Sequence, residues 1–279
     1  MPELPEVETM RRGVAPAAGR TISRVEFVRT QARPIDVTPS REGFRRRVAG
    51  RRIEQVDRIG KRVALVLDNA HTVVFEPRMT GLVLLADPPT QEHLRLVLTL
   101  AGSRSPRRLL FWDRRGLGCV HVYSPEELRR LTEEKLGPDA LAVDAAALRL
   151  RLEKSRRAIK TALLDQAAVA GIGNLYASEI LHLARIHPER PCCDLTGPHW
   201  RRLHTALRHV LTEAIRYEGS TLSDGTYRNA LNKAGGYQNE HRVYDKAGGD
   251  CPTCGRAKIV RIVQAQRSTF FCPRCQARR

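Results

Sequence analysis

The sequence lacks any run of roughly 18 uncharged apolar residues, the length at which a membrane-spanning helix is expected. Its opening residues, MPELPEVET, are acidic and do not show the basic and then apolar segments of a secretory signal. No repeat with a period of about 20–50 residues is visible. We therefore expect a cytoplasmic protein with no membrane partner and no solenoid architecture.

Acidic residues are also in deficit. The chain holds 30 Asp and Glu against 48 Lys and Arg, which gives a net charge of +18. A polyanionic partner is the simplest explanation of that charge, and nucleic acid is the leading candidate. With 279 residues, 42% hydrophobic and 28% charged, the chain can form two domains, or one domain and a small module.

The order of secondary structure predicts an α+β multidomain protein. Val7, Met10 and Val14 recur at helical spacing and predict a short N-terminal helix. From Thr21 to Tyr123 short apolar or alternating runs follow one another, which predicts a β-sandwich or barrel without intervening helices. These runs are ISRVEFV, RVALVLD, HTVVF, LRLVLTL, RRLLFW and CVHVY.

The pattern becomes helical at Ser124, which can cap a helix with Pro125 at its first position and Glu127 three residues after the cap. A long helix near its C-terminal end carries one apolar face, formed by Trp200, Leu203, Leu207, Val210 and Ala214. Residues 219–249 are rich in Gly, Asn, Ser and Asp and show little periodicity. A loop of that length is expected to be mobile or functional.

Four cysteines near the C-terminus have the spacing C-x2-C-x17-C-x2-C. Two such turns form a tetrahedral thiolate cage that suits Zn²⁺, and the apolar stretches KIVRIV and STFF between them predict a zinc-ribbon hairpin. A lone hairpin buries too little to fold by itself, so the zinc is structural. The ligands are Cys251, Cys254, Cys272 and Cys275, and we expect reduced thiols at Cys119, Cys192 and Cys193.

Two further motifs carry chemistry. An apolar helix is expected to run into Gly171-Ile172-Gly173-Asn174, after which a new helix begins near Leu175 with outward-facing N–H groups that can bind an anion. At the N-terminus, removal of Met1 would leave Pro2 as a secondary amine able to attack an aldehydic carbon. Glu3 beside it could donate a proton, although a proline at position two is by itself usually inert.

Together, PELPEVET, GIGNLYASEILHLARIHP and the last 25 residues resemble the formamidopyrimidine-DNA glycosylase family of bacterial base-excision enzymes. The resemblance covers essentially the whole chain and implies four parts. These are a catalytic β-sandwich domain with a short N-terminal helix (1–124), a linker (125–140), a helix–two-turn–helix DNA-binding domain with a lesion-capping loop (141–241), and a zinc finger (242–279).

The resemblance implies a bifunctional DNA glycosylase/AP lyase that removes 8-oxoguanine and formamidopyrimidines from damaged double-stranded DNA, acting as a monomer at the nucleoid. Pro2 would form a Schiff base at C1′ while Glu3 acts as acid/base. Lys61 would assist β-elimination and Arg267 δ-elimination. The implied DNA contacts are Met79, His93, Arg115, Leu117, Lys154, Arg156, Lys160, Gly173 and Asn174. The stretch STLSDGTYRNALNKAGGYQ would close over the flipped base.

The chain departs from the family pattern D-P-R-R-F-G at FWDRRGLG, where Gly116 replaces the second arginine and Leu117 the phenylalanine. Glu76 and Pro77 also replace a His-Leu pair before Met79. These departures affect discrimination of the opposite base and leave the chemistry intact. Two alternatives remain open. An endonuclease VIII-type enzyme for oxidised pyrimidines typically opens PEGPE, and a non-catalytic lesion-binding protein would not need Pro2, Glu3 or Lys61.

Overall fold

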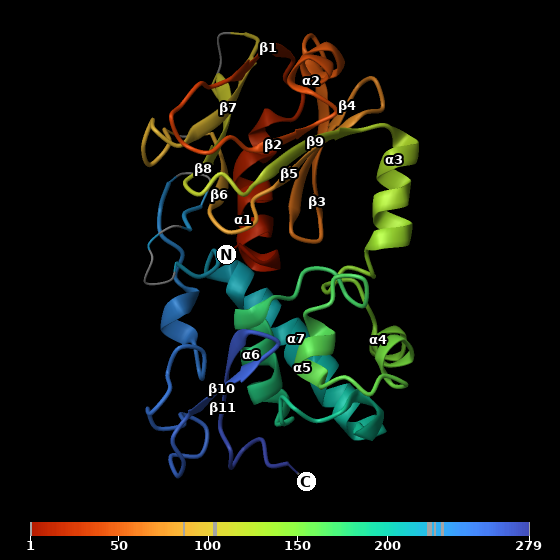
Figure 1. The fold of residues 1–279 in the computed structure, drawn as a ribbon, viewed down its shortest axis with the longest axis vertical. Coiled ribbons are helices and arrows are strands. Elements are labelled where there is room, and N and C mark those ends of the chain that lie inside the picture. The colour runs from red at the N-terminus through yellow and green to blue at the C-terminus, as the bar shows by residue number, and fades with distance from the viewer. Residues whose placement is uncertain are drawn as a thin grey trace. The chain divides into compact units, whose positions relative to one another are not determined.

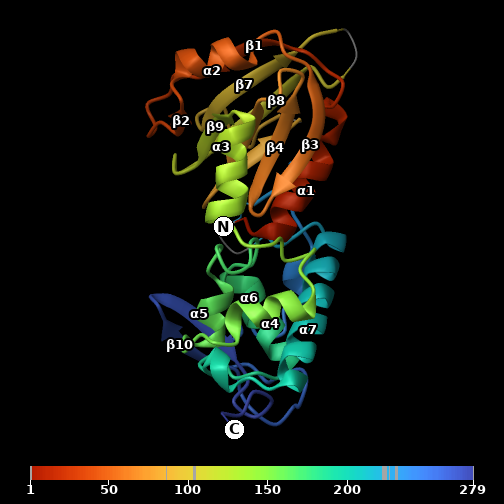
Figure 2. The ribbon, with the colours of Figure 1, turned by 90° about the vertical axis from the view of Figure 1, so that its right-hand side faces the viewer.

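The computed structural model describes residues 2–278 except 86, 103–104, 222–224, 226 and 230–231. The chain forms two compact units, drawn in Figures 1 and 2. The first combines Met1–Glu134 with Ile215–Gln238, and the second combines Lys135–Ala214 with Asn239–Arg279. The expected boundaries run in sequence order, whereas in the structure the segment Ile215–Gln238 packs with the N-terminal unit.

The first unit is built on two β-sheets (Figure 2). One has the order β1-β7-β8-β6 and the other β2-β9-β5-β4-β3. Neighbouring strands are antiparallel except β2 and β9, which are parallel. The strands are β1 Ile22–Phe27, β2 Asp36–Thr38, β3 Ile53–Ile59, β4 Arg62–Leu67, β5 Thr72–Glu76, β6 Gly81–Leu84, β7 Leu94–Leu100, β8 Arg108–Asp113 and β9 Cys119–Tyr123. The predicted sandwich is confirmed.

The N-terminal helix α1 (Leu4–Val14) packs against this sandwich and continues into a short 3-10 turn, Ala15–Ala17. Val7, Met10 and Val14 are fully buried in the hydrophobic core of the unit. The prediction of a short amphipathic helix is therefore confirmed, and the apolar face at helical spacing is the face that the sandwich covers.

The expectation that no helix interrupts the strands was wrong, because α2 (Arg41–Val48) lies between β2 and β3. Ser40 caps it by accepting a hydrogen bond from the backbone N–H of Gly43 at 3.0 Å. Phe44 and Val48, four residues apart, are fully buried. The run of arginines between them obscures this pattern, since a single pair of apolar residues is a weak helical signal.

The second unit is mainly helical and ends in a hairpin. Its elements include α4 Ala145–Leu152, α5 Ile159–Leu163, α6 Asn174–Ala184, the 3-10 turn η3 Cys192–Asp194 and the strands β10 Val260–Gln264 and β11 Arg267–Phe271. Between the sandwich and α4 lie α3 (Pro125–Arg130), which has the predicted Ser124–Glu127 capping box, and the π-helical turn Leu131–Lys135. The long helix α7 (Gly197–Arg216) precedes the segment that returns to the first unit, which ends in η4 (Tyr237–Glu240).

All five residues of the apolar face predicted for α7 are buried, so that prediction is confirmed. The expectation of an apolar helix running directly into Gly171 was wrong. Helix α5 ends at Leu163, and residues 164–173 form turns. The Gln166 side chain replaces the missing helical hydrogen bonds, since its amide donates to the carbonyls of Leu164 and Ile172 and accepts from the Gly171 N–H.

Among the described residues, none of the helices combines the length and the hydropathy that crossing a bilayer requires.

Candidate functional site

The first turn of α1 fixes the N-terminal residues. Glu3 is the N-cap of the helix and is only 4% exposed. Its backbone N–H donates to Glu6 Oε2 at 2.8 Å, and the two residues form a reciprocal capping box. Pro2 is buried directly before it. Because α1 packs into the core, Pro2 and Glu3 are held on a rigid element rather than on a free tail.

The Glu6 carboxylate also reaches the segment that follows α7. Its Oε1 accepts from the Ser220 backbone N–H at 2.9 Å. Gly219 has a φ of +79°, and a Cβ there would lie 2.8 Å from Glu6 Oε1, so this close approach requires glycine. Sequence analysis missed Glu6, although the Glu3-x-x-Glu6 pattern before an apolar run is the signal of a capping box and could have found it.

The predicted lesion-capping loop begins where Glu6 binds it. The Tyr227 hydroxyl donates to the Glu218 carbonyl at 2.9 Å and to the Glu6 carbonyl at 3.4 Å. Burial raises the pKa of Tyr227 well above its ordinary value, so the phenol remains a donor at neutral pH. Residues 222–224, 226 and 230–231 of this loop lie outside the described residues, and its closure over a base stays a prediction.

Lys61 lies in the two-residue turn between β3 and β4, directly before the predicted strand RVALVLD. Gly60 precedes it with a φ of +57°, the left-handed conformation that tight hairpin turns use. Arg58 steadies this turn, because its Nη1 donates to the Gly60 carbonyl at 2.9 Å while its Nε contacts Glu8 Oε2 at 3.2 Å. Glu8 belongs to α1, so the turn carrying Lys61 is braced against the helix that begins just after Pro2 and Glu3.

Met79 and the loop 113–118 lie together because Asp113 and Thr80 connect them. The fully buried Asp113 accepts from the Thr80 hydroxyl, from the Arg115 N–H at 3.2 Å and from the Gly118 N–H at 2.7 Å. Met79 is 37% exposed and Arg115 is exposed. Leu117 is half-buried. Two apolar side chains that can wedge into a duplex therefore stand on adjoining loops, beside an available guanidinium.

His93 lies against Trp112 with 5.6 Å between ring centroids, and its side chain is 17% exposed. Its backbone carbonyl accepts from the Asp113 N–H at 2.9 Å, which places it next to the same loop. Its role in DNA binding stays a prediction.

In the second unit, Lys160 is fully buried and joins the start of α6 to the hairpin. Its Nζ donates to Asn174 Oδ1 at 2.7 Å, to the Ser268 carbonyl at 3.0 Å and to Thr269 Oγ1 at 2.6 Å. Asn174 Nδ2 donates to the same Ser268 carbonyl at 2.9 Å. These contacts position Asn174 and the hairpin, and the buried Lys160 does not present its charge at the surface.

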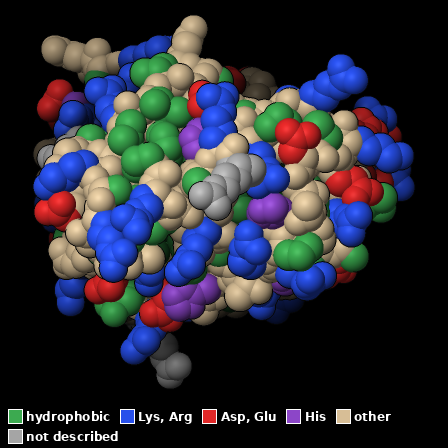
Figure 3. Space-filling model, turned by 90° about the horizontal axis from the view of Figure 1, so that it is seen from below, with side chains coloured by type: hydrophobic (Ala, Val, Ile, Leu, Met, Phe, Trp, Pro, Cys, Tyr) green, Lys and Arg blue, Asp and Glu red, His purple; other side chains and the backbone are tan. Residues whose placement is uncertain are grey.

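Gly173 is the N-cap of α6 with extended backbone, and Asn174 is its first residue, as the two-turn motif predicts. Lys154 and Arg156 are exposed on the connection between α4 and α5, and no ion pair engages either within the described part of the chain. Arg157 differs, since it pairs with Asp165 at 2.8 Å. Lys and Arg side chains are also spread across the face drawn in Figure 3.

The cysteines form the predicted metal site. The four Sγ atoms all lie within 4.8 Å of one another, and Cys251–Cys275 and Cys254–Cys272 are each 3.8 Å apart. With Zn–S bonds of about 2.3 Å, a tetrahedron has edges of about 3.8 Å. The site therefore fits one structural Zn²⁺.

Helix α6 anchors the segment that leads into the metal site. Glu179 accepts backbone hydrogen bonds from Arg242, Val243 and Tyr244 at 2.8–2.9 Å. His182 Nε2 lies 3.5 Å from Cys251 Sγ. The turn of the hairpin, Ala265-Gln266, has positive φ at both residues, and the exposed Arg267 follows it. Arg267 is thus presented next to the turn that the zinc site and α6 hold in place.

The predicted site residues are divided between the two units. The first unit carries Pro2, Glu3, Lys61, Met79, His93, Arg115 and Leu117. The second unit carries Lys154, Arg156, Lys160, Gly173, Asn174, Arg267 and the four cysteines. Sequence analysis missed the residues that hold these in place, namely Glu6, Arg58, Thr80, Asp113, Gln166 and Glu179. Gln166 and one contact of Glu6 are local, whereas most of them connect positions that are distant in the sequence, as in the Thr80–Asp113 hydrogen bond across 33 residues. No local pattern reports such a contact.

Three family models match the chain. They are the formamidopyrimidine-DNA glycosylase N-terminal domain at residues 1–120, the formamidopyrimidine-DNA glycosylase H2TH domain at residues 136–226, and the zinc finger found in FPG and IleRS at residues 249–278. A formamidopyrimidine-DNA glycosylase of Chloroflexus aurantiacus is 46% identical over 99% of this chain and 98% of its own length. The enzyme of that name from Bacillus subtilis is 37% identical over the full length of both chains.

Solved structures agree with the sequence relatives. The MutM (Fpg) protein of Thermus thermophilus has a TM-score of 0.84 and 40% identity, covering 99% of this chain and 98% of that one. A Lactococcus lactis Fpg mutant in complex with a Fapy-dG containing DNA has a TM-score of 0.88 and 34% identity, covering 99% and 100%.

Proposed function

Because this chain belongs to the formamidopyrimidine-DNA glycosylase family, we propose that Pro2 and Glu3, at the start of α1, carry its reaction. The chain is a DNA glycosylase of base excision repair with AP lyase activity, it binds damaged DNA, and its zinc finger holds one structural zinc. Its substrates include formamidopyrimidines, and we extend them to 8-oxoguanine on the family resemblance. Met79 and Arg115 favour the purine branch over the endonuclease VIII-type alternative.

The proposed reaction starts when removal of Met1 frees the Pro2 nitrogen. Its lone pair attacks C1′ of the flipped nucleotide as the bond between C1′ and the base breaks and the base leaves with a proton. Glu3 gives a proton to O4′ as the C1′–O4′ bond opens, which leaves an iminium between Pro2 and C1′. An α-amino group titrates near pH 7.7–8.0, so a useful fraction is neutral at physiological pH.

The later steps use basic residues of both units. The iminium acidifies the C2′ protons, so loss of one expels the 3′ phosphate, and we assign assistance in this β-elimination to Lys61. To Arg267 we assign assistance in the δ-elimination, the step that releases the 5′ phosphate. Met79, Leu117 and Arg115 would fill the space of the flipped base. His93, Lys154, Arg156, Gly173 and Asn174 would contact the backbone, with Lys160 positioning Asn174.

The observation that carries this proposal is the rigid start of α1. Buried Pro2 precedes Glu3, which is the N-cap of α1. The bridge Glu8–Arg58–Gly60 ties the Lys61 turn to the same helix. Three candidate catalytic groups are thus supported by one element. We further propose that the protein acts as a monomer on chromosomal DNA in the bacterial cytoplasm, at the nucleoid. The bacterial origin of its relatives and their complexes with DNA support this setting.

Borohydride trapping tests the chemistry. The purified protein, with Met1 removed and zinc bound, is incubated with duplexes carrying formamidopyrimidine, 8-oxoguanine or thymine glycol, and with undamaged duplex. We expect a covalent band on the two purine lesions because borohydride reduces the iminium. The band should be absent in Pro2→Gly and retained in Pro16→Gly, an exposed proline just after α1.

Each other outcome points elsewhere. A band on thymine glycol alone would favour the oxidised-pyrimidine branch. A band that persists in Pro2→Gly can come from the glycine α-amine, so the cross-linked peptide is then mapped, and a cross-link away from position 2 would assign the nucleophile to another amine. No band on any duplex would favour a non-catalytic lesion-binding protein.

A further inference from the structure

Residues 29–36 are fastened along the loop 113–118. The buried guanidinium of Arg95 bridges the two, donating through Nη1 to Thr30 Oγ1 at 2.8 Å and through Nε to the Asp113 carbonyl at 2.9 Å. At the other end the Asp36 N–H donates to the Gly118 carbonyl at 3.3 Å, where β2 begins to pair with β9. Residues 29–36 therefore belong to the same surface as Arg115 and Leu117.

Between these two fastenings, Gly116 packs directly on the backbone of Arg33. Its φ is +61°, and a Cβ would lie 2.3 Å from the Arg33 carbonyl oxygen. No side chain fits at position 116 while Arg33 occupies this place. Gly116 stands where the family pattern has its second arginine, and the space that a side chain at this position would need is occupied by the backbone of Arg33.

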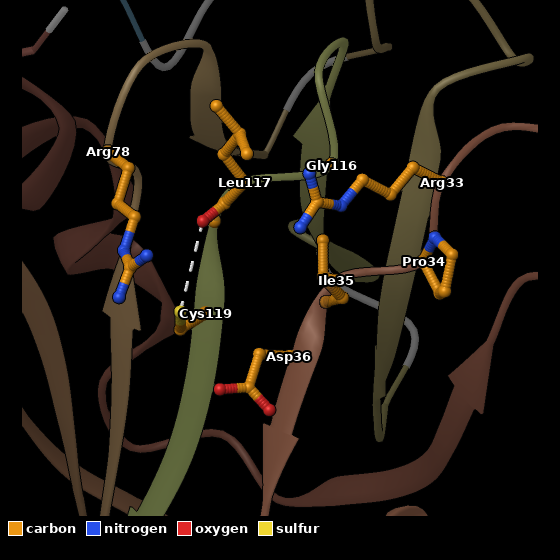
Figure 4. Close-up of a pocket in the computed structure, with 9 residues that line it drawn as sticks. Arg33, Pro34, Ile35, Asp36, Arg78, Gly116, Leu117 and Cys119 are labelled. Atoms are coloured by element: carbon orange, nitrogen blue, oxygen red, sulfur yellow. Dashed lines mark hydrogen bonds between the residues drawn. The ribbon is translucent and has the colours of Figure 1, made fainter.

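Arg33 brings a guanidinium to the place where position 116 has none. Figure 4 shows its side chain extended toward Gly116 and Leu117, with Arg78 on the other side of Leu117. These residues line a cavity of about 470 Å³ that is shared with Asp36 and Cys119. Arg33 is exposed, and within the described residues no hydrogen bond or ion pair holds its guanidinium.

Arg78 shows a second sign of function. It adopts a φ of +49°, a left-handed conformation that is strained for a residue other than glycine and is found disproportionately at binding sites. Its Nε lies 3.3 Å from Glu76 Oε1, but that carboxylate also holds Arg62 at 2.8 Å, and the Arg78 side chain remains 52% exposed. Arg78 directly precedes Met79, so it stands beside one apolar wedge as Arg33 stands beside the other.

We propose that Arg33 and Arg78 bind backbone phosphates of the DNA on the two sides of Leu117, and that Arg33 replaces the arginine missing at position 116. The inference rests on the proposed function, since it concerns the duplex that this enzyme binds. Planar guanidinium forks match phosphate oxygens, and such contacts hold the duplex in register around an inserted side chain. The Asp36 carboxylate lies at the far end of the cavity in Figure 4, so phosphate is favoured at the Leu117 end.

The test measures binding to a duplex with a tetrahydrofuran abasic analogue, which cannot be cleaved, between about 50 and 200 mM salt. Arg33→Ala and Arg78→Ala should each weaken binding about tenfold at low salt. Each should also reduce the slope of log affinity against log salt by about 0.9, the change expected for one lost phosphate contact. Arg33→Lys keeps the charge and should keep the slope.

Arg24→Ala is the matched control, because Arg24 lies on β1 with a side chain 72% exposed and away from this cavity. It should bind as the wild type does. Equal affinity and slope in Arg33→Ala, Arg24→Ala and wild type would overturn the inference, as would a loss in Arg33→Lys as large as that in Arg33→Ala. Melting temperatures of all variants should match the wild type, since these side chains are exposed.

Base release by the wild type from a formamidopyrimidine duplex separates this inference from the proposed function. If the wild type excises the base and Arg33→Ala binds as the wild type does, the phosphate contact of Arg33 is ruled out while the proposed function stands. A wild type that neither binds nor excises would overturn the proposed function and this inference with it.

Discussion

At the scale of single residues, Glu6 connects the start of α1, where we propose that the chemistry takes place, to the segment that follows α7. One carboxylate oxygen accepts from the Glu3 N–H and the other from the Ser220 N–H. Both contacts are buried, and a buried donor left without an acceptor costs about 1–3 kcal/mol. Glu6 is therefore a positioning residue for the place where we locate the chemistry.

Replacing Glu6 by Gln tests that role. The amide keeps the size of the side chain but replaces one of the two accepting oxygens by an NH2 group, so one of the two backbone N–H donors faces a donor instead of an acceptor. We expect Glu6→Gln to lower the free energy of unfolding by about 1–2 kcal/mol and to slow single-turnover base excision at least about tenfold. The measurements are denaturant unfolding and rapid-quench kinetics on a formamidopyrimidine duplex.

Glu42→Gln is the control for Glu6→Gln, since Glu42 is an exposed glutamate in the first turn of α2. It should match the wild type in both measurements. Wild-type excision by Glu6→Gln would show that the contacts to Glu3 and Ser220 do not position the reacting groups.

Sequence reveals residue types at fixed spacing, and this is why the zinc ligands and the Pro2-Glu3 motif could be predicted. It does not reveal which distant group a side chain meets. Lys160 illustrates the difference, because a basic residue near a two-turn motif suggests a phosphate contact. In the structure its charge is satisfied internally by Asn174, Ser268 and Thr269.

At the scale of elements, α1 and the β3–β4 hairpin are held together by ion pairs between side chains. Glu8 contacts Arg11 and Arg12 of its own helix at 2.9 and 2.8 Å and Arg58 of β3 at 3.2 Å. Burial raises the pKa of Glu8, but hydrogen bonds from Arg11 and Arg12 and the charge of Arg58 outweigh it and leave that pKa below its ordinary value of 4.5. The folded state thus favours the ionised form of Glu8.

Because the pKa of Glu8 is lower in the folded state, its contribution to the free energy of unfolding decreases at low pH. Stability from Glu8 is fully present above the unfolded pKa, near 4.5, and is lost as the pH falls through the lower folded value. We expect Glu8→Gln to be about 1–2 kcal/mol less stable than the wild type at pH 7. The difference should shrink as the pH falls below about 4.5. Urea unfolding at pH 7, 5 and 3.5 measures it.

Glu26→Gln provides the comparison for Glu8→Gln, because Glu26 forms an exposed pair with Arg24. Its effect should be small at every pH. A gap between Glu8→Gln and the wild type that stays constant down to pH 3.5 would contradict the role of the ionised Glu8.

Strands with continuous or alternating apolar residues and the long apolar face of α7 were predictable, whereas α2, with only two apolar residues, was not. The strands β4, β5, β7, β8 and β9 present runs of buried residues, and α7 presents a continuous apolar face. By contrast, α2 shows only Phe44 and Val48 among arginines. The turns after α5 depend on a side chain, Gln166, whose amide replaces backbone hydrogen bonds that a pattern of hydrophobicity does not encode.

At the scale of the whole molecule, the chain leaves the first unit at Glu134 and returns to it at Ile215. Tyr227 is a buried core residue of the returning segment. It is 5% exposed and belongs to the same hydrophobic cluster as Val7 and Phe44. A sequence read in order suggests domains that follow one another, because only packing reveals that a late segment completes an early core.

The last prediction concerns this return, and the two tryptophans make it measurable. Trp112 lies in the first unit and Trp200 in the second, and both are buried.

Tyr227→Ala removes a buried aromatic ring, which costs about 3–4 kcal/mol. The fluorescence transition of Trp112, followed in a Trp200→Phe background, should shift to lower denaturant. The transition of Trp200 in a Trp112→Phe background should shift much less, since Tyr227 belongs to the core of the first unit. Tyr217→Ala, at a tyrosine 38% exposed in the same segment, should leave both transitions near those of the wild type. A shift confined to Trp200 would mean that Tyr227 stabilises the second unit and that the segment does not complete the sandwich core.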